Sequence, residues 1–379
     1  MKILIHLRSD ADAKHGGDVA LARQYKRILE DGGHSVDITT SSLAFEGHYD
    51  LALTFNLDRP FEPAQFIDNC NKNNIPVMIY ALHHPTAGVA QYLKFGTKGL
   101  RRVFAMLAGC RPALYESILA LVKVASGQMK IQRAANLKFL YASIAQRFIL
   151  NNVNTILVST QMELSKTAEE FQVAQDRFAV VPHILDIAPV SSPLPTGPER
   201  QIDVICAGRF ESRKNQLLVA RLARKMTTTK FVFVGTPSST EARYFAEFQA
   251  EIAGLDNVAY YPSLPLDELR AMFRNARLFI SLSWFEVVSL TEMEAMACGC
   301  HLLVGKNSYA EYFTGDRAIF VEPDALESVG EAMQAWLDQD RKAAPAFAGL
   351  TADDRIFEMA PAQVARAFSS IFDKLKVRS

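Results

Sequence analysis

Residues 278–304 read LFISLSWFEVVSLTEMEAMACGCHLLV and decide the fold class. The apolar run at 278–282 predicts a strand, and the spacing of Ser289 and Glu292 predicts a capping box that starts a helix directly afterwards. A second apolar run at 301–304 predicts the next strand. A strand, a helix and a strand in this order form a βαβ unit, which makes the two strands parallel.

The same alternation extends outward from this stretch in both directions. Short apolar runs that predict further strands lie at 2–7, 35–39, 51–55, 77–82, 155–159, 178–181, 204–207, 231–235 and 258–261. Polar segments with helical patterns or turn residues separate most of them. We therefore predict an α/β protein with two Rossmann-like, doubly wound domains.

A proline-rich stretch sets the predicted domain boundary, because residues 189–200 contain four prolines. We predict an N-terminal domain at 1–187, a linker at 188–200 and a C-terminal domain at 201–350. A final helix in 351–379 is expected to pack back toward the N-terminal domain. Ligands of open α/β sheets bind outside the carboxyl ends of the strands, so an interdomain cleft is the expected site.

Charge is balanced overall but not locally. The 379 residues carry 41 Lys plus Arg and 41 Asp plus Glu, which argues against a nucleic-acid-binding protein. Between His83 and Leu150, however, a single acid, Glu116, stands among ten basic residues. These are Lys94, Lys98, Arg101, Arg102, Arg111, Lys123, Lys130, Arg133, Lys138 and Arg147. The region 89–150 also has helical patterns and no predicted strand.

Cysteine usage and hydropathy indicate a cytoplasmic setting. The five cysteines are odd in number and form no CxxC motif. The apolar run at the N-terminus is too short for a signal peptide, and no run of about 18 apolar residues predicts a membrane span.

The loop and helix after the strand at 278–282 carry candidate phosphate and ribose ligands. The backbone amides of Ser289, Leu290 and Thr291 are expected at a helix N-terminus, which favours a phosphate. Glu294 lies one turn further and can accept hydrogen bonds from two vicinal ribose hydroxyls. Glu286 lies in the loop before the helix. A pair of solvated acids beside an ordinary helix start is the alternative.

A second loop carries two cations. Arg209 and Lys214 follow the strand at 204–207 and precede the next helix, so together they can neutralise a diphosphate. Surface cations are the alternative interpretation. The pair Asp10 and Asp12 could suggest a metal site, but about one such pair is expected by chance, so we predict no metal.

Two further loops follow predicted strands of the N-terminal half and carry candidate site residues. Gly16 and Gly17 permit close approach of the backbone to a ligand. His83 and His84 follow the strand at 77–82 and can orient a sugar hydroxyl. No P-loop, dinucleotide fingerprint or GxSxG motif occurs.

Taken in order, these pieces resemble the large retaining GT-B glycosyltransferase family 4. The matching motifs are G-R-x4-K from Gly208 to Lys214 and E-x7-E from Glu286 to Glu294, which runs into E-A-M-A-C-G. Residues 180–186 are similar to the V-x-P-N-G-V-D segment of the family. The family usually has glycines after the first acid, whereas this chain has Val287 and Val288.

The resemblance implies a GT-B fold and transfer of a hexose, with retention, from GDP-mannose or a UDP-hexose. Arg209 and Lys214 would stabilise the leaving diphosphate, and Glu294 would hold the ribose. Glu286 would lie near the sugar, and His83, with His84 as the alternate, would contact the sugar. Gly16 and Gly17 would close on the sugar or the phosphate, and no metal or other cofactor is implied.

The basic region suggests where the acceptor lies. Lys94, Lys98, Arg101 and Arg102 have helical spacing beside an apolar stripe that includes Leu100, which predicts a helix on an anionic membrane surface. A lipid-linked acceptor in surface polysaccharide or glycolipid synthesis, at the inner face of the membrane, follows from this. A solvated basic face over a core helix is the alternative, and a nucleic-acid groove is a weaker one.

Two other functions remain open at this stage. The chain could be another GT-B enzyme, such as a sugar-nucleotide epimerase or a phosphorylase. It could also be a catalytically impaired protein that binds a sugar or a membrane, because the glycines after Glu286 are missing.

Overall fold

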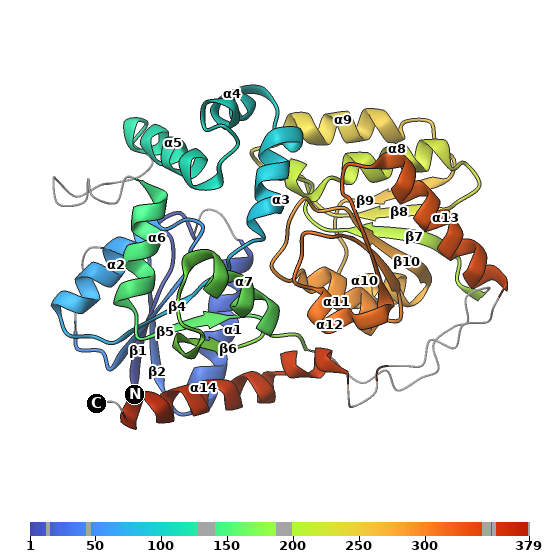
Figure 1. The fold of residues 1–379 in the computed structure, drawn as a ribbon. Coiled ribbons are helices and arrows are strands. Elements are labelled where there is room, and N and C mark those ends of the chain that lie inside the picture. Colours follow the sequence, from blue (N-terminus) through green and yellow to red (C-terminus); the bar gives the residue numbers. More distant parts are fainter. Residues whose placement is uncertain are drawn as a thin grey trace. The chain divides into compact units, whose positions relative to one another are not determined.

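The computed structural model describes residues 1–12, 16–42, 47–127, 141–186, 199–342, 350 and 354–377. The chain divides into two compact units, each with its own six-stranded parallel sheet (Figure 1). Unit 1 comprises Met1–Thr86, Lys98–Ile184 and Glu358–Ser379, and unit 2 comprises Ala87–Thr97 and Leu185–Phe357. The predicted α/β fold with two doubly wound sheets is confirmed.

The sheet of unit 1 has the strand order β2-β1-β3-β4-β5-β6. Its strands are β1 (Lys2–His6), β2 (Ser35–Thr39), β3 (Leu51–Phe55), β4 (Val77–Tyr80), β5 (Thr155–Val158) and β6 (Phe178–Val180). The α-helices whose first residue belongs to unit 1 are α1 (Gly17–Asp31), α2 (Phe61–Lys72), α3 (Thr86–Gln91), α4 (Gly99–Leu107), α5 (Pro112–Ala125), α6 (Ala142–Asn152), α7 (Gln161–Phe171) and α14 (Pro361–Val377).

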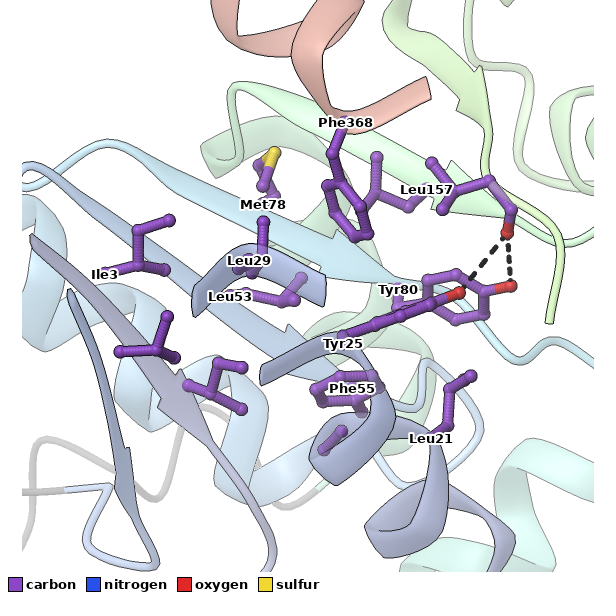
Figure 2. Packing of buried hydrophobic residues seen from close by; sticks show 14 of the residues in the cluster. Ile3, Leu21, Tyr25, Leu29, Leu53, Phe55, Met78, Tyr80, Leu157 and Phe368 are labelled. Carbon is purple, nitrogen blue, oxygen red and sulfur yellow. Dashed lines mark hydrogen bonds between the residues drawn. The ribbon is translucent and has the colours of Figure 1, made fainter. Parts of the chain in front are cut away.

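Alternate residues of each strand in unit 1 enter two different cores. Ile3 and Ile5 face a cluster that includes α1 and α14, whereas Leu4 faces the cluster formed by α2, α6 and α7. Burial on both faces explains why these strands read as continuous apolar runs. Figure 2 shows the first cluster, in which the hydroxyls of Tyr25 and Tyr80 both donate to the carbonyl of Val181.

The last helix of the chain is part of unit 1. Phe368 of α14 packs edge-on against Tyr25 of α1, with 5.0 Å between the ring centroids (Figure 2). Val364 and Ile371 enter the same cluster. The apolar stripe of α14 therefore completes one face of the first sheet.

The sheet of unit 2 has the order β12-β11-β10-β7-β8-β9. Its strands are β7 (Ile202–Ala207), β8 (Phe231–Val234), β9 (Val258–Tyr261), β10 (Ala276–Ser281), β11 (His301–Gly305) and β12 (Ala318–Val321). The helices are α8 (Gln216–Lys225), α9 (Ala242–Ile252), α10 (Leu266–Arg274), α11 (Leu290–Ala297), α12 (Glu311–Thr314) and α13 (Leu326–Lys342).

A short early segment, Ala87–Thr97, belongs to unit 2, although the predicted N-terminal domain, 1–187, included it. The reason is close backbone packing. A Cβ atom on Gly88 would lie 2.5 Å from Asn307, and one on Gly96 would lie 2.9 Å from Trp284. A side chain at Gly88 would clash with Asn307, and one at Gly96 would clash with Tyr92 and Trp284, because this segment packs closely against the rest of unit 2.

The prediction of one basic helix through residues 94–102 is wrong. A π-helical turn, Tyr92–Gly96, ends before Thr97 and Lys98, which are extended, and α4 begins at Gly99 with a φ of +58°. Lys94 therefore lies in unit 2, and the other three basic residues lie in unit 1.

The rest of the basic region is helical where it is described, and no strand of the structure lies in its described part. The predicted basic residues Lys130, Arg133 and Lys138 lie outside the described residues. Of the helices in the described part of the chain, none is long and apolar enough to cross a membrane.

Candidate functional site

The topology of unit 2 defines a switch point at the carboxyl ends of β7 and β10. From β7 the chain continues to β8 on one side, and it later returns to β10 on the other side of β7. Ligands of open parallel sheets bind at this kind of switch point. The loops at 208–215 and 282–289 follow these two strands. The motif from Gly208 to Lys214 lies in the first loop, and the motif from Glu286 to Glu294 begins in the second and continues into α11.

Backbone hydrogen bonds hold the two loops together. The amide of Trp284 donates to the carbonyl of Arg213 over 3.0 Å. The guanidinium of Arg213 donates back to the carbonyl of Phe285 over 3.0 Å, and it lies 5.4 Å from the centre of the Phe285 ring. The cations of the first loop are therefore fixed relative to the second loop.

Glu286 forms ion pairs with two cations of the loop 208–215. Lys214 Nζ lies 2.5 Å and Arg213 Nη1 lies 2.8 Å from the same oxygen, Oε1 of Glu286. Arg213 also pairs with Glu211 at 2.8 Å. Burial would lower the pKa of Arg213, but Glu286 and Glu211 outweigh it and raise that pKa. The predicted Lys214 and Glu286 thus form one charged cluster.

Arg213 is a member of this cluster that the sequence analysis missed. Its position next to Lys214 in the same loop was the available clue. Arg209, which the sequence did predict, lies at the start of the loop, with Nε 3.5 Å from Glu211 and a side chain that is 47% exposed. The loop therefore carries three cations, of which Arg209 is the most exposed.

Helix α11 begins at Leu290 as predicted, but the predicted capping box does not form. The Ser289 side chain accepts no hydrogen bond from the helix amides. Glu292 instead turns inward and is 1% exposed, and its Oε2 atom has no hydrogen-bond partner among the described residues. Burial and the nearby Glu286 raise the pKa of Glu292 to about 7, against the opposing effect of Lys214.

The second predicted acid lies further along the same helix. Glu294 is half-buried, and burial raises its pKa while Arg270 of α10 opposes that shift. Val287 and Val288, which replace the usual glycines, have buried side chains. The amide of Tyr309 donates to the carbonyl of Val287, which fixes the loop before α11.

The segment Ala87–Thr97 supports the cation loop from outside. The hydroxyls of Tyr92 and Ser212 lie 2.8 Å apart, and the Tyr92 ring packs edge-on against Phe285. Asn307 donates to Gln91 over 2.9 Å. Tyr92 therefore contacts both loops of the crevice.

Three predicted site residues lie in unit 1 instead. Gly16 and Gly17 stand at the start of α1, where a Cβ atom on Gly16 would lie 2.4 Å from Asp18. His83 is 4% exposed and lies between two carboxylates, with Nδ1 2.5 Å from Asp58 and Nε2 3.1 Å from Glu170.

These carboxylates decide the charge of His83. Burial alone would lower its pKa, but Asp58 and Glu170 raise it to about 10. Asp58 also accepts from the backbone amide of His84 and lies 2.7 Å from Nδ1 of its ring. His83 is therefore a charged centre in a network of hydrogen bonds, and contact of His83 or His84 with a sugar stays a prediction.

The residues predicted to bind the donor divide between the units. Unit 2 holds Arg209, Lys214, Glu286, Ser289, Leu290, Thr291 and Glu294, and unit 1 holds Gly16, Gly17 and His83. Within the described parts of the chain, no three His, Cys, Asp or Glu residues group closely enough to hold a metal ion.

Most of unit 2 lies in a region of the chain that matches a known protein family. Residues 195–346 match the family Glycosyl transferases group 1. A D-inositol 3-phosphate glycosyltransferase of Acidothermus cellulolyticus is 25% identical over 182 residues, which are 43% of this chain and 40% of that protein. The match therefore spans well under half the length of this relative.

Solved structures with low sequence identity share the whole fold. Sucrose-phosphate synthase of Thermosynechococcus elongatus is similar over 100% of both chains, with 13% identity and a TM-score of 0.66. Anabaena HepE in complex with UDP and glucose covers 99% of this chain and 100% of its own, with 14% identity and a TM-score of 0.62. The fold is GT-B, as predicted.

Proposed function

We propose that this protein is a glycosyltransferase that transfers a hexose from a nucleotide-diphosphate sugar, and that unit 2 binds the donor. The observation that carries the proposal is the cation cluster at the β7/β10 switch point, where Arg213 and Lys214 are held by one oxygen of Glu286. The match of residues 195–346 to a glycosyltransferase family supports it.

The chemistry follows from the charge that develops in the reaction. The bond between the anomeric carbon and the diphosphate breaks, and its electron pair stays on the diphosphate. The acceptor oxygen bonds to the same carbon, and its proton passes to the departing phosphate. Fixed cations that face this growing negative charge lower the barrier without reorganising, which is the role we assign to Arg209, Arg213 and Lys214. We assign the nucleotide ribose to Glu294.

Retention of configuration and independence of metal are part of the proposal. Both come from the resemblance to family 4, and the cation loop supports the second. EDTA should leave nucleotide release from the sugar donor unchanged. Loss of release with EDTA, restored by Mg²⁺ or Mn²⁺, would show that a metal neutralises the diphosphate.

A screen of nucleotides tests the central claim. The sequence leaves two donors open, GDP-mannose and a UDP-hexose, so UDP and GDP are the two nucleotides to compare. The HepE structure holds UDP. One of these two nucleotides should raise the melting temperature of the whole protein. The protein should also hydrolyse the sugar nucleotide of the same base slowly, with water as the acceptor, and so release that nucleotide. No stabilisation by any nucleoside diphosphate would contradict the proposal.

We also propose that the acceptor is lipid-linked and that α4 docks on an anionic membrane, as in surface polysaccharide or glycolipid synthesis. Helix α4 exposes large apolar side chains, with Leu100 66% and Leu107 69% exposed. Lys98 and Arg101 are also exposed. This combination favours a surface that enters the headgroup region, where each cation contributes about 1 kcal/mol.

Vesicle sedimentation tests the membrane surface. The protein should bind vesicles of phosphatidylcholine mixed with phosphatidylglycerol at low salt, and phosphatidylcholine alone much less. Changing Lys98, Arg101 and Arg102 to Ser should release it, while Lys94→Ser in unit 2 serves as the matched control. Wild-type protein that ignores the anionic vesicles would remove the support for a lipid-linked acceptor.

A further inference from the structure

The segment Ala87–Thr97 contacts three loops of unit 2, and the donor reaction proposed above assigns it no role. Its side chains Gln91 and Tyr92 reach the loop 208–215, the loop 282–289 and the loop that follows β11. The first two of these loops carry residues assigned to the donor. The contacts of the segment therefore affect how those residues are held.

Tyr92 joins the loop 208–215 to the loop 282–289. Its hydroxyl lies 2.8 Å from the hydroxyl of Ser212, which precedes Lys214 by two residues. Its ring packs edge-on against Phe285, the residue directly before Glu286, with 5.8 Å between the ring centroids. Tyr92 and Phe285 are each 9% exposed, so the contact is buried. One buried side chain thus holds each loop beside its member of the charged cluster.

A second set of hydrogen bonds leads from the segment to the backbone of Glu286. The side-chain amide of Asn307 donates to Gln91 over 2.9 Å and to the carbonyl of Trp284 over 3.0 Å. The backbone carbonyl of Asn307 accepts from the amide of Glu286 over 2.9 Å. Gln91 is held in turn, because it donates to Asp324 over 3.2 Å. The segment therefore supports the loop 282–289 at its backbone as well as at the Phe285 ring.

The packing of the segment leaves no room for the Tyr92 ring to move toward its own chain. A side chain at Gly96 would meet both the Tyr92 ring and the indole of Trp284. Trp284 is 5% exposed, and 6.3 Å separates its ring centroid from that of Tyr92. Close-packed interiors transmit displacements, so a shift of Tyr92 would be felt in the loop 282–289.

The spacing of the two loops matters because the charges of the cluster lie on both. Lys214 and Glu286 meet at 2.5 Å across the two loops, so the distance between the loops sets the distance between the charges. Fixed cations lower a barrier only if they are in place before negative charge develops. A displacement of about 1 Å can lower a rate about 10²-fold. A side chain that fixes the spacing can therefore change the rate without touching the donor.

We propose that Tyr92 is a positioning residue of the donor site, which holds the loop 208–215 and the loop 282–289 at a fixed spacing. The inference rests on the proposed donor reaction. Tyr92 acts through Ser212 and Phe285, and it needs no contact with the donor. Its hydroxyl should therefore affect kcat more than the affinity for the nucleoside diphosphate.

Steady-state release of nucleotide from the sugar donor tests this role. Tyr92→Phe keeps the ring and removes the hydrogen bond to Ser212, so it should lower kcat about fivefold and change the affinity for the nucleoside diphosphate less. Tyr49→Phe is the matched control, because Tyr49 is buried in unit 1 and its hydroxyl donates to Asp37 over 3.0 Å. Equal kcat values in these two variants, or a change in affinity alone, would overturn the proposal.

A double-mutant cycle with Lys214 separates positioning from a direct role. If Tyr92 acts through the loop 208–215, Tyr92→Phe should lower kcat less in a Lys214→Ala background than in wild type, because one of the cations that it positions is absent. Gly96→Ala, which sets a methyl group against the Tyr92 ring, should also lower kcat. An undiminished fivefold loss in the Lys214→Ala background would contradict a role through the loop.

Tryptophan fluorescence tests the packing without any reaction. The chain has two tryptophans, so Trp336→Phe leaves Trp284 as the single emitter. In this background Tyr92→Ala should raise the quenching of Trp284 by acrylamide about twofold, because the indole loses a buried neighbour. Tyr141→Ala, at an exposed tyrosine of unit 1, should leave quenching unchanged. Unchanged quenching in Tyr92→Ala would mean that Tyr92 does not hold the loop 282–289.

The two measurements distinguish failure of this proposal from failure of the proposed function. Wild-type protein that releases no nucleotide from any sugar donor would contradict the donor reaction, while increased quenching in Tyr92→Ala would still support the hold on the loop. Wild-type protein that releases nucleotide, with no slower release in Tyr92→Phe, would contradict the positioning role and leave the donor reaction intact.

Discussion

The two sheets of this protein have the same topology at their switch points but opposite balances of charge. At the β7/β10 crevice of unit 2, the cation loop brings Arg209, Arg213 and Lys214 against Glu211 and Glu286. At the β1/β3 switch point of unit 1, the residues that line a cavity of about 360 Å³ include four acids and three cations. One fold thus supplies two switch points, and the side chains on the loops give each a different charge.

The difference extends to how the charges are held. In unit 2, two of the three cations, Arg213 and Lys214, converge on one carboxylate oxygen of Glu286, whereas Arg209 pairs with Glu211 and is the most exposed of the three. In unit 1 Arg8 is held between two aspartates. We therefore expect variants of the cation loop in unit 2 to change the reaction with the donor, and variants of Arg8 in unit 1 to leave it unchanged.

The largest effect should come from Lys214→Ala. Loss of one fixed cation at the diphosphate should lower nucleotide release from the sugar donor about 10²–10³-fold, because this stabilisation acts where charge develops. Steady-state kinetics of release would measure it. Lys225→Ala, at an exposed position of α8, is the control. Equal rates in the two variants would remove Lys214 from the donor site.

The next largest effect should come from substitution of His83 in unit 1, and it should change the free energy of unfolding. With a pKa near 10 in the fold and an ordinary value of 6.5, His83 contributes stability that is complete below pH 6.5 and is lost as the pH rises through 10. His83→Gln should lower the free energy of unfolding by about 2–3 kcal/mol at pH 6. Urea unfolding at pH 6, 8 and 10 measures this.

The same variant also tests the contrast between the units. The gap between wild type and His83→Gln should narrow toward pH 10. His48→Gln, an exposed histidine of unit 1, should keep the wild-type curve. A gap that is constant with pH would mean that His83 is not charged in the fold.

Glu294→Ala should have a smaller effect, and on binding. Removing the acceptor for the ribose hydroxyls should weaken nucleotide affinity about tenfold in calorimetry, whereas Glu286→Ala should mainly lower the rate. Glu268→Ala, on the exposed side of α10, is the control. Unchanged affinity in Glu294→Ala would refute the ribose assignment.

The smallest effect should come from the buried acid beneath the cation loop. The pKa of Glu292 is about 7 in the fold against an ordinary 4.5, so its ionisation destabilises the fold as the pH rises from 4.5 to 7. Glu292→Gln should therefore be more stable than wild type at pH 8 and equally stable at pH 4.5, as measured by urea unfolding. Glu327→Gln on α13 should show no such trend. A difference that does not vary with pH would contradict the assigned ionisation.

Much of the candidate donor site could be predicted from the sequence, because parallel strands bring their carboxyl ends to one edge of a sheet. This placed Arg209, Lys214, Glu286 and Glu294 in unit 2 before any coordinates. The side-chain partners could not be predicted in the same way. The spacing of Ser289 and Glu292 fits a capping box as well as an inward acid, and the packing around α11 chose the second.

Helical spacing had a similar limit in the basic region. The basic residues of 94–102 keep the spacing of a helix. The helix is nevertheless interrupted before Gly99, which adopts a positive φ. The helical spacing of residues shows which of them share a face if the helix is continuous. It does not show whether the helix is continuous. The glycines in this segment were the local sign of the break.

By itself the sequence determined the two doubly wound sheets and the loops that carry the cations and acids, since apolar periodicity and turn residues act over short distances along the chain. Tertiary structure decided what required distant segments to meet. It joined Ala87–Thr97 to unit 2, brought Glu116 and His6 into the lining of one cavity, and surrounded His83 with Asp58 and Glu170. Burial and charge at such meeting points depend on neighbours far away in sequence, which no local pattern encodes.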